Sequence, residues 1–307
     1  MKATGLHDPF PARPDDPDER LAVTQNGGSR LKRRRALLAW LASHSILILA
    51  CALVVAPIYF LVLGSFKSVE EFFTAPFGLP QHFGIGNYRR AWTEASISTT
   101  VKNSAIVTVS AVLISTVVSC LASYSIARLP LRGSMFWRLL FVGGLIVPVQ
   151  LIMVAIFIIM RWIGLLGSLG SLILVYSTFG IPLGVLVLVG FFQALPRELS
   201  EAATIDGATD LQVFLRVILP LSMAPILTVV ILNGVWIWND FFIALVLSTK
   251  PSVETLPLGI LNFFGVYSTE WGLIFASVVL SALPVVALYL LMTRRFIAGM
   301  TAGSVKG

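Results

Sequence analysis

The residues best suited to contacting a polar solute are gathered in one short stretch of an otherwise apolar segment. Between positions 233 and 240 stand two asparagines, two tryptophans and an aspartate: Asn233, Trp236, Trp238, Asn239 and Asp240. Aromatic faces stack on sugar-like rings, and amide or carboxylate groups bind hydroxyls, so this set could line a solute site. Helical spacing places Asn233, Trp236 and Asp240 near one face. The alternative, that these residues hold neighbouring helices together, stays open on the sequence.

A second group lies in the polar loop 194–221 and is suited to contacting another protein. Glu198 and Glu201 fall in the early turns of an expected helix, where carboxylates interact favourably with the helix dipole. Gly207 is expected to end this helix with a positive φ, and Thr209, followed three residues later by a glutamine, resembles a capping box for a second helix. The pattern predicts a small, rigid helix–corner–helix knob that could insert into a groove of a partner. An ordinary amphipathic surface loop is the alternative.

Residues arranged for catalysis or for binding ATP are missing from the sequence. The chain has no G-x-x-x-x-G-K-[ST] loop, no H-E-x-x-H and no G-x-S-x-G. Its three His and two Cys are too few for a metal site or a disulfide framework. We therefore assign no catalytic residue, no metal and no cofactor to this chain, and we expect it not to be an enzyme.

The composition indicates that lipid is the solvent of most of the chain. Of its 307 residues, 57% are hydrophobic and only 12% are charged, and the mean hydropathy is +0.89. Soluble domains are usually about 45–50% apolar and about 25% charged. The net charge of +7 comes from basic residues at the ends of apolar runs, which favours a membrane surface over a nucleic acid as partner.

Six apolar runs are long enough to cross a bilayer as helices of about 20 residues. They comprise residues 37–64, 104–127, 136–160, 171–192, 223–248 and 272–293. Asp240 is the main ionisable residue inside them, which gives little support to an ion-coupled secondary transporter, although that class remains an alternative. The sequence therefore predicts an all-α integral membrane protein with six transmembrane helices.

The distribution of Lys and Arg predicts the orientation. With the N-terminus in the cytoplasm, sixteen of the 22 basic residues lie in inside segments and six in outside segments. This N-in/C-in arrangement puts loop 194–221, between spans four and five, on the cytoplasmic face. Residues 1–35 are predicted to be a disordered cytoplasmic tail, residues 36–300 the six-helix membrane domain, and residues 301–307 a cytoplasmic C-terminal tail.

The loop residues also resemble a known motif. Glu201-Ala202-Ala203, with Gly207 four positions later and Pro220 beyond, resembles the EAA motif of permease subunits of binding-protein-dependent ABC importers. In that family the loop forms coupling helices that dock in a groove of a separate ATPase subunit. The resemblance implies a set of ATPase-coupling residues in this chain, namely Glu198, Glu201, Ala202, Ala203, Asp206, Gly207, Ala208 and Pro220.

Further matches are similar to the carbohydrate permeases of the family, in particular to the maltose-type inner-membrane subunit. They are Asp206-Gly207-Ala208, Asn87-Tyr88, Asn103-Ser104, Trp238-Asn239-Asp240-Phe241 and the terminal segment 298–307. In the maltose system that tail reaches between the two ATPase subunits, so the resemblance implies ATPase contacts at Gly299, Thr301, Gly303 and Lys306. Ser304, where the group often has Ala or Gly, is a departure. The resemblance covers residues 37–307.

The resemblance implies a function and a set of partners. The chain is expected to be a permease subunit in the inner (cytoplasmic) cell membrane that moves a sugar or oligosaccharide inward; another small polar solute is the alternative. Its expected partners are a homologous second permease, two ATPase subunits that bind ATP-Mg, an extracytoplasmic solute-binding protein and membrane lipid. The residues expected along the substrate path are Asn233, Trp236, Asn239, Asp240, Tyr176 and Gln150.

Overall fold

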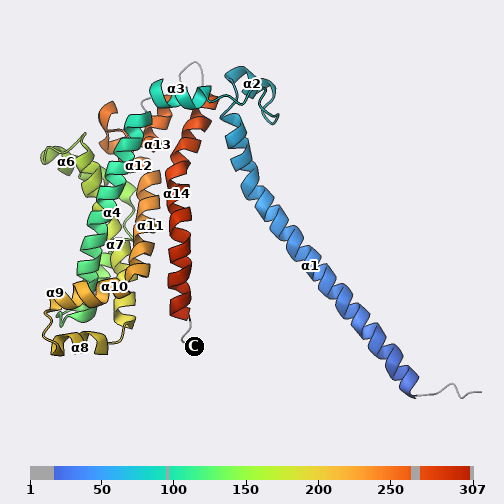
Figure 1. The fold of residues 1–307 in the computed structure, drawn as a ribbon. Coiled ribbons are helices and arrows are strands. Elements are labelled where there is room, and N and C mark those ends of the chain that lie inside the picture. Colours follow the sequence, from blue (N-terminus) through green and yellow to red (C-terminus); the bar gives the residue numbers. More distant parts are fainter. Residues whose placement is uncertain (1–16, 95–96, 264–269, 305–307) are drawn as a thin grey trace, which may run out of the picture. The chain divides into compact units, whose positions relative to one another are not determined.

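The structure is a computed structural model that describes residues 17–94, 97–263 and 270–304, with side chains from Leu37 onward except 288, 289 and 291–304. All regular secondary structure in these residues is helical (Figure 1). The chain divides into two compact units, Met1–Phe60 and Leu61–Gly307. Each is described by itself below.

Helix α1 spans Pro17–Gly64 and makes up the described part of the first unit. It begins well before the first expected span, inside the segment for which the composition predicts disorder. Residues 17–35 include five Arg and two Leu, which are good helix formers, and the helix of the apolar segment continues into them. Residues 1–16 lie outside the described residues. The apolar part, Leu37–Gly64, corresponds to the first expected span.

The second unit is built around two long helices, α4 (Ile97–Arg128) and α7 (Leu169–Ala194), which lie side by side (Figure 1). Small residues let their backbones approach closely, the usual solution for helices packed in lipid. A Cβ at Gly184 would stand 2.6 Å from the Cβ of Ser119, and one at Gly180 would stand 3.0 Å from the Cβ of Ser115. These contacts fix the pair that positions the rest of the unit.

Span three was expected as one helix over 136–160, and that expectation is wrong. The segment forms two helices, α5 (Ser134–Gly143) and α6 (Val149–Trp162), with an irregular break between them. Gly143 and Gly144 have low helix propensity, and Pro148 disfavours helical geometry in the residue before it. The side chains of 145–148 in the break are exposed in the isolated chain.

Span five, expected over 223–248, is also divided. Helix α11 (Met223–Asn239) ends where Asp240 adopts an extended conformation, and α12 (Phe242–Leu247) follows. The Asp240 carboxylate accepts a hydrogen bond from the Ile243 backbone N–H at 2.9 Å, which stabilises the start of α12. At the other end of α11, the helical segment Asp210–Leu221 meets it at an angle of 76°.

Length and composition identify three described helices that could each cross a membrane, in Leu37–Gly64, Ile97–Arg128 and Leu169–Ala194. The bent pair formed by Asp210–Leu221 and α11 is a fourth candidate. Shorter apolar helices are α5, α6 and the Trp271–Ala287 part of α14, which as a whole runs Trp271–Ser304.

Short helices and loops lie at the end of the second unit where α4 begins. They are α2 (Val69–Thr74), α3 (Gly86–Glu94), η2 (Pro251–Val253), α13 (Leu256–Gly259) and η3 (Ile260–Phe263). Asn103 of α4 donates to the carbonyls of Ser252 and Glu254, both at 2.9 Å, and the Ser104 hydroxyl accepts the Leu256 N–H at 2.8 Å. Side chains of α4 thus hold the backbone of the loop 252–256.

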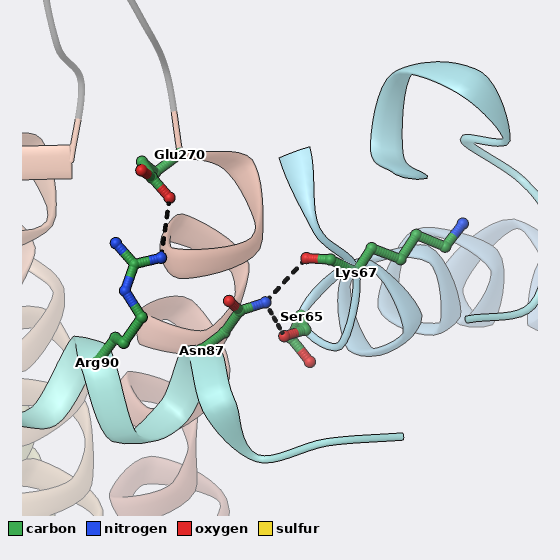
Figure 2. Close-up of polar contacts among 5 residues, drawn as sticks. All are labelled: Ser65, Lys67, Asn87, Arg90 and Glu270. Atoms are coloured by element: carbon green, nitrogen blue, oxygen red, sulfur yellow. Dashed lines mark hydrogen bonds and ion pairs between the residues drawn. The ribbon is translucent and has the colours of Figure 1, made fainter. Parts of the chain in front are cut away.

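Another asparagine, on α3, holds the chain where α1 ends. The Asn87 amide donates to the carbonyls of Ser65 and Lys67, both at 2.9 Å (Figure 2). A Cβ at residue 272 would lie 2.4 Å from the Lys67 carbonyl oxygen, so Gly272 of α14 is required for this close approach. Figure 2 also shows the ion pair of Arg90 with Glu270, at 3.3 Å. The end of α1, α3 and the start of α14 therefore form one fixed junction.

Candidate functional site

The first half of the knob is helix α8 (Glu198–Ile205), followed by the predicted glycine corner. Gly207 has a φ of +84°, a conformation that side chains rarely adopt. The Gly207 N–H donates to the Thr204 carbonyl at 3.0 Å, and the Ala208 N–H donates to the Ala203 carbonyl at 2.9 Å. These two bonds form a Schellman motif, which satisfies the last carbonyls of α8 and turns the chain sharply.

The second half begins with the predicted capping box. The Thr209 hydroxyl accepts the Gln212 N–H at 3.4 Å, and the Gln212 side chain accepts the Thr209 N–H at 2.9 Å. Helix α9 (Asp210–Val213) is followed by a π-helical turn, η1 (Phe214–Ile218), and by α10 (Leu219–Leu221). The sequence predicts an ordinary helix here. Pro220 has no N–H and its ring clashes with the carbonyl four residues earlier, and a wider turn before it removes both conflicts.

The knob is fixed to the ends of α4 and α7. Ala203 and Ala208 pack against a buried cluster that includes Tyr124 and Phe214. The Tyr124 hydroxyl donates to the Asp210 carbonyl at 3.1 Å, and the Arg128 guanidinium donates to the Leu195 carbonyl at 2.7 Å. Sequence reasoning missed Tyr124 and Arg128. Their position in the last two turns of span two, at the end that the predicted topology puts on the same face as the loop, is the signal that could have indicated them.

The remaining predicted loop residues face outward. Glu198, Glu201, Ala202, Asp206, Gly207 and Pro220 are exposed. A cavity of about 520 Å³ lies between α8, α9 and the end of α4. Its lining includes two basic residues, Arg128 and Arg197, and two acidic residues, Glu201 and Asp210. The knob thus offers acidic and small residues on its surface and a polar hollow at its base.

The predicted tail residues are only partly described. Gly299, Thr301 and Gly303 lie in the last turns of α14, which ends at Ser304. Lys306 lies outside the described residues.

Three of the predicted solute-path residues come together beside the break in span five. The Tyr176 hydroxyl of α7 donates to the Asp240 carboxylate at 2.8 Å. The Trp236 ring of α11 meets the Tyr176 ring edge to face, with centroids 5.8 Å apart. Tyr176 is fully buried, whereas 38% of Trp236 is exposed. The group thus combines a partly exposed indole with a buried phenol that is hydrogen-bonded to a carboxylate.

The other predicted solute-path residues lie apart from this group. Asn233 is buried and donates to the Gly180 carbonyl of α7 at 3.1 Å, so it joins two helices. Trp238, which belongs to the same polar stretch but not to the expected solute path, donates to the Ser281 carbonyl of α14 at 3.0 Å. Asn239 is exposed and bonds within its own helix, and Gln150 is exposed on α6. Asn233, Trp236 and Asp240 all contact α7, although α11 ends before Asp240.

Comparisons with known proteins agree on the family. The profile described as "Binding-protein-dependent transport system inner membrane component" matches residues 116–301. The diacetylchitobiose uptake system permease protein NgcG of Streptomyces coelicolor is 34% identical over 85% of this chain and 87% of its own length. The multiple sugar-binding transport system permease protein MsmG of Streptococcus mutans is 34% identical over 83% of this chain and 92% of its own length.

The fold is also found among solved structures. The crystal structure of a bacterial ABC transporter involved in import of the acidic polysaccharide alginate matches with a TM-score of 0.73 at 20% identity. The match covers 94% of this chain and 100% of that chain. A second crystal structure, of a bacterial alginate ABC transporter with a pentasaccharide-bound periplasmic protein, matches with a TM-score of 0.59 at 17% identity. From its sequence relatives, this chain belongs to the binding-protein-dependent transport system inner membrane components, a family of multi-pass membrane permeases.

Proposed function

We propose that the chain is one of two permease subunits of an ATP-driven importer and that it moves a sugar or oligosaccharide inward across the cytoplasmic membrane. The observation that carries the proposal is the knob 194–221, whose rigid corner and outward-facing acidic residues suit docking on a separate ATPase. The substrate class is supported by the relatives named for diacetylchitobiose uptake and for multiple sugar-binding transport.

The proposed membrane topology has six spans, N-in and C-in. The spans are α1, α4, the α5–α6 pair, α7, the α11–α12 pair and α14. In this arrangement the knob lies on the cytoplasmic side, and the junction in Figure 2 lies on the outer side. Two divided spans are compatible with a bilayer because irregular backbone is tolerated where it is buried in protein or lines a water-filled cavity.

The proposed coupling runs from the ATPase to the spans through α8. Two ATPase subunits bind ATP-Mg and close on each other, and each displaces the permease knob docked in its groove. Glu201 supplies a charged contact, and Gly207 keeps the corner in the shape that the groove receives. Because Tyr124 and Arg128 tie the knob to α4, its displacement is passed to the bundle. The tail residues Gly299, Thr301, Gly303 and Lys306 add a further contact with the ATPase pair.

The proposed solute path passes the breaks in spans three and five. Trp236 provides a face on which a sugar ring can stack, and Asp240 with Tyr176 provides groups that bind hydroxyls. The exposed segment 145–148 faces the same path or the second permease, since lipid would leave its backbone groups unsatisfied. An extracytoplasmic solute-binding protein delivers the solute to the outer side.

Co-purification from mild detergent with a tag on this chain tests the proposal. We expect a second permease and a P-loop ATPase to co-purify, and Glu201→Lys to release the ATPase while the second permease is kept. Glu70→Lys is the matched control, since Glu70 is also an exposed helical acid but lies on α2, at the opposite end of the unit. A chain that purifies alone and transports solute without ATP would overturn the proposal in favour of an ion-coupled carrier.

A further inference from the structure

A short segment at the outer end of the second unit exposes an unusual number of large apolar side chains. This segment, residues 73–85, runs from the end of α2 to the start of α3 and is called the apolar loop here. Its exposed apolar side chains, with exposed fractions between 67% and 85%, are Phe73, Phe77, Leu79, Phe83 and Ile85. They outnumber what a surface in contact with water normally carries over so short a stretch.

The apolar loop is held in shape by polar groups that bind its backbone from inside. Lys67 is 1% exposed, and its ammonium donates to the carbonyls of Ala75 and Pro76 at 2.7 and 2.9 Å. The Glu71 carboxylate accepts the Gln81 N–H at 2.6 Å. A buried lysine needs such partners, because an ammonium without them is costly to remove from water. Lys67 and Glu71 thus bind three backbone groups of the loop, while its apolar side chains are exposed.

The apolar loop is also fixed to α14 through α2, the helix that leads into the loop. Phe72 stacks on Trp271 with ring centroids 5.6 Å apart, and meets Phe275 at 5.5 Å. Both partners belong to the first turns of α14. The loop therefore cannot fold its apolar side chains inward without breaking this cluster and the bonds of Lys67.

The position of the apolar loop in the chain indicates what covers it. The apolar span of α1 ends at Gly64, and Lys67, which holds the loop, follows three residues later. The loop therefore follows closely along the chain on the end of a candidate membrane span, the point at which the chain would leave the hydrocarbon. Aromatic rings are favoured where a span leaves the hydrocarbon, and the loop carries three Phe, one His (His82) and no Lys or Arg.

We propose that the apolar loop inserts into the outer leaflet of the membrane, at the boundary between headgroups and acyl chains, and anchors the outer junction of the permease. Burial of apolar area drives the insertion, and no specific headgroup is needed because the loop contains no Lys or Arg. The inference goes beyond the proposed function and takes from it only the outside location of this end.

A fluorescent label on the loop tests the anchor in the assembled importer, reconstituted in nanodiscs of phosphatidylethanolamine and phosphatidylglycerol. The background is Cys51→Ser, and the label NBD is attached at Leu79→Cys or, as control, at Glu70→Cys, whose side chain is exposed on α2. We expect blue-shifted emission at position 79 and at least twofold quenching by lipids spin-labelled near the headgroup. The label at position 70 should emit as it does in water and remain unquenched.

Two outcomes would overturn the anchor. One is equal, water-like emission and no lipid quenching at both positions. The other is a label at position 79 that becomes shielded only when the solute-binding protein is added, which would assign the loop to that protein instead. A membrane-impermeant thiol reagent on intact cells tests the topology separately from the anchor. Labelling of Glu70→Cys from outside would show that the proposed orientation holds even where the anchor fails.

Discussion

Replacing Gly207 by valine isolates the contribution of the knob's corner. Its φ of +84° is strained for any side chain, and a Cβ at this position would meet no atom within 4 Å. The cost is therefore conformational alone, about 1–2 kcal/mol, and greatest for a β-branched residue. A cost of that size lowers the ratio of intact to opened corner by about 5–30-fold. We expect ATP-driven uptake to fall, with Gly207→Asn retaining more activity because asparagine tolerates this conformation.

The assay is ATP-driven oligosaccharide uptake into proteoliposomes that contain the assembled importer. Gly164→Val is the matched control, because Gly164 has a φ of +73°, equally open surroundings and a position outside the knob. Both valine variants should lose similar thermal stability, while only Gly207→Val loses uptake and ATPase binding. Equal uptake by the two variants, or full uptake by Gly207→Val, would refute the role of the corner.

Two further changes test the bundle and the group at the span-five break. Gly184→Ala should lower the free energy of unfolding by about 1–3 kcal/mol, measured by thermal melting, because its Cβ would meet Ser119. Gly190→Ala in the same helix is the control, since its Cβ would enter open space and should not destabilise the protein. Similar melting of the two variants would contradict the tight α4–α7 packing. Tyr176→Phe removes the hydrogen bond to Asp240, so we expect the free energy of unfolding to fall by about 1–3 kcal/mol and the apparent KM for uptake to rise. An unchanged KM would place this pair outside the solute path.

The knob was the part most accessible to sequence reasoning, because its shape depends on local backbone chemistry. A glycine after a short helix and a Thr with Gln three residues later specify a corner and a cap without any distant contact. The structure has both features, at Gly207 and Thr209. The bonds from Tyr124 and Arg128 could not be predicted in the same way, since they join residues far apart in sequence.

The spans show where hydropathy alone reaches its limit. An apolar run predicts burial in lipid but does not report whether the backbone inside it stays helical. In span three the Gly143-Gly144 pair and Pro148 interrupt an apolar run, and in span five Asp240 starts a new helix. Pro182, in contrast, lies inside the continuous helix α7, so proline alone did not decide the outcome. Packing against neighbours decides which of these residues breaks a helix.

The bonds at the two ends of α4 have a mechanical consequence. This helix of 32 residues contains neither glycine nor proline, so it has no built-in place to bend. Near the start of α4, Asn103 is hydrogen-bonded to the loop 252–256. At the end of α4, about 38 Å away, Arg128 is hydrogen-bonded to the knob. Such a rod behaves as a lever: when it tilts about a point near its middle, the loop and the knob must swing in opposite directions. In the proposed topology, motion at one face of the membrane would thereby be converted into opposed motion at the other, without any change inside the helix itself.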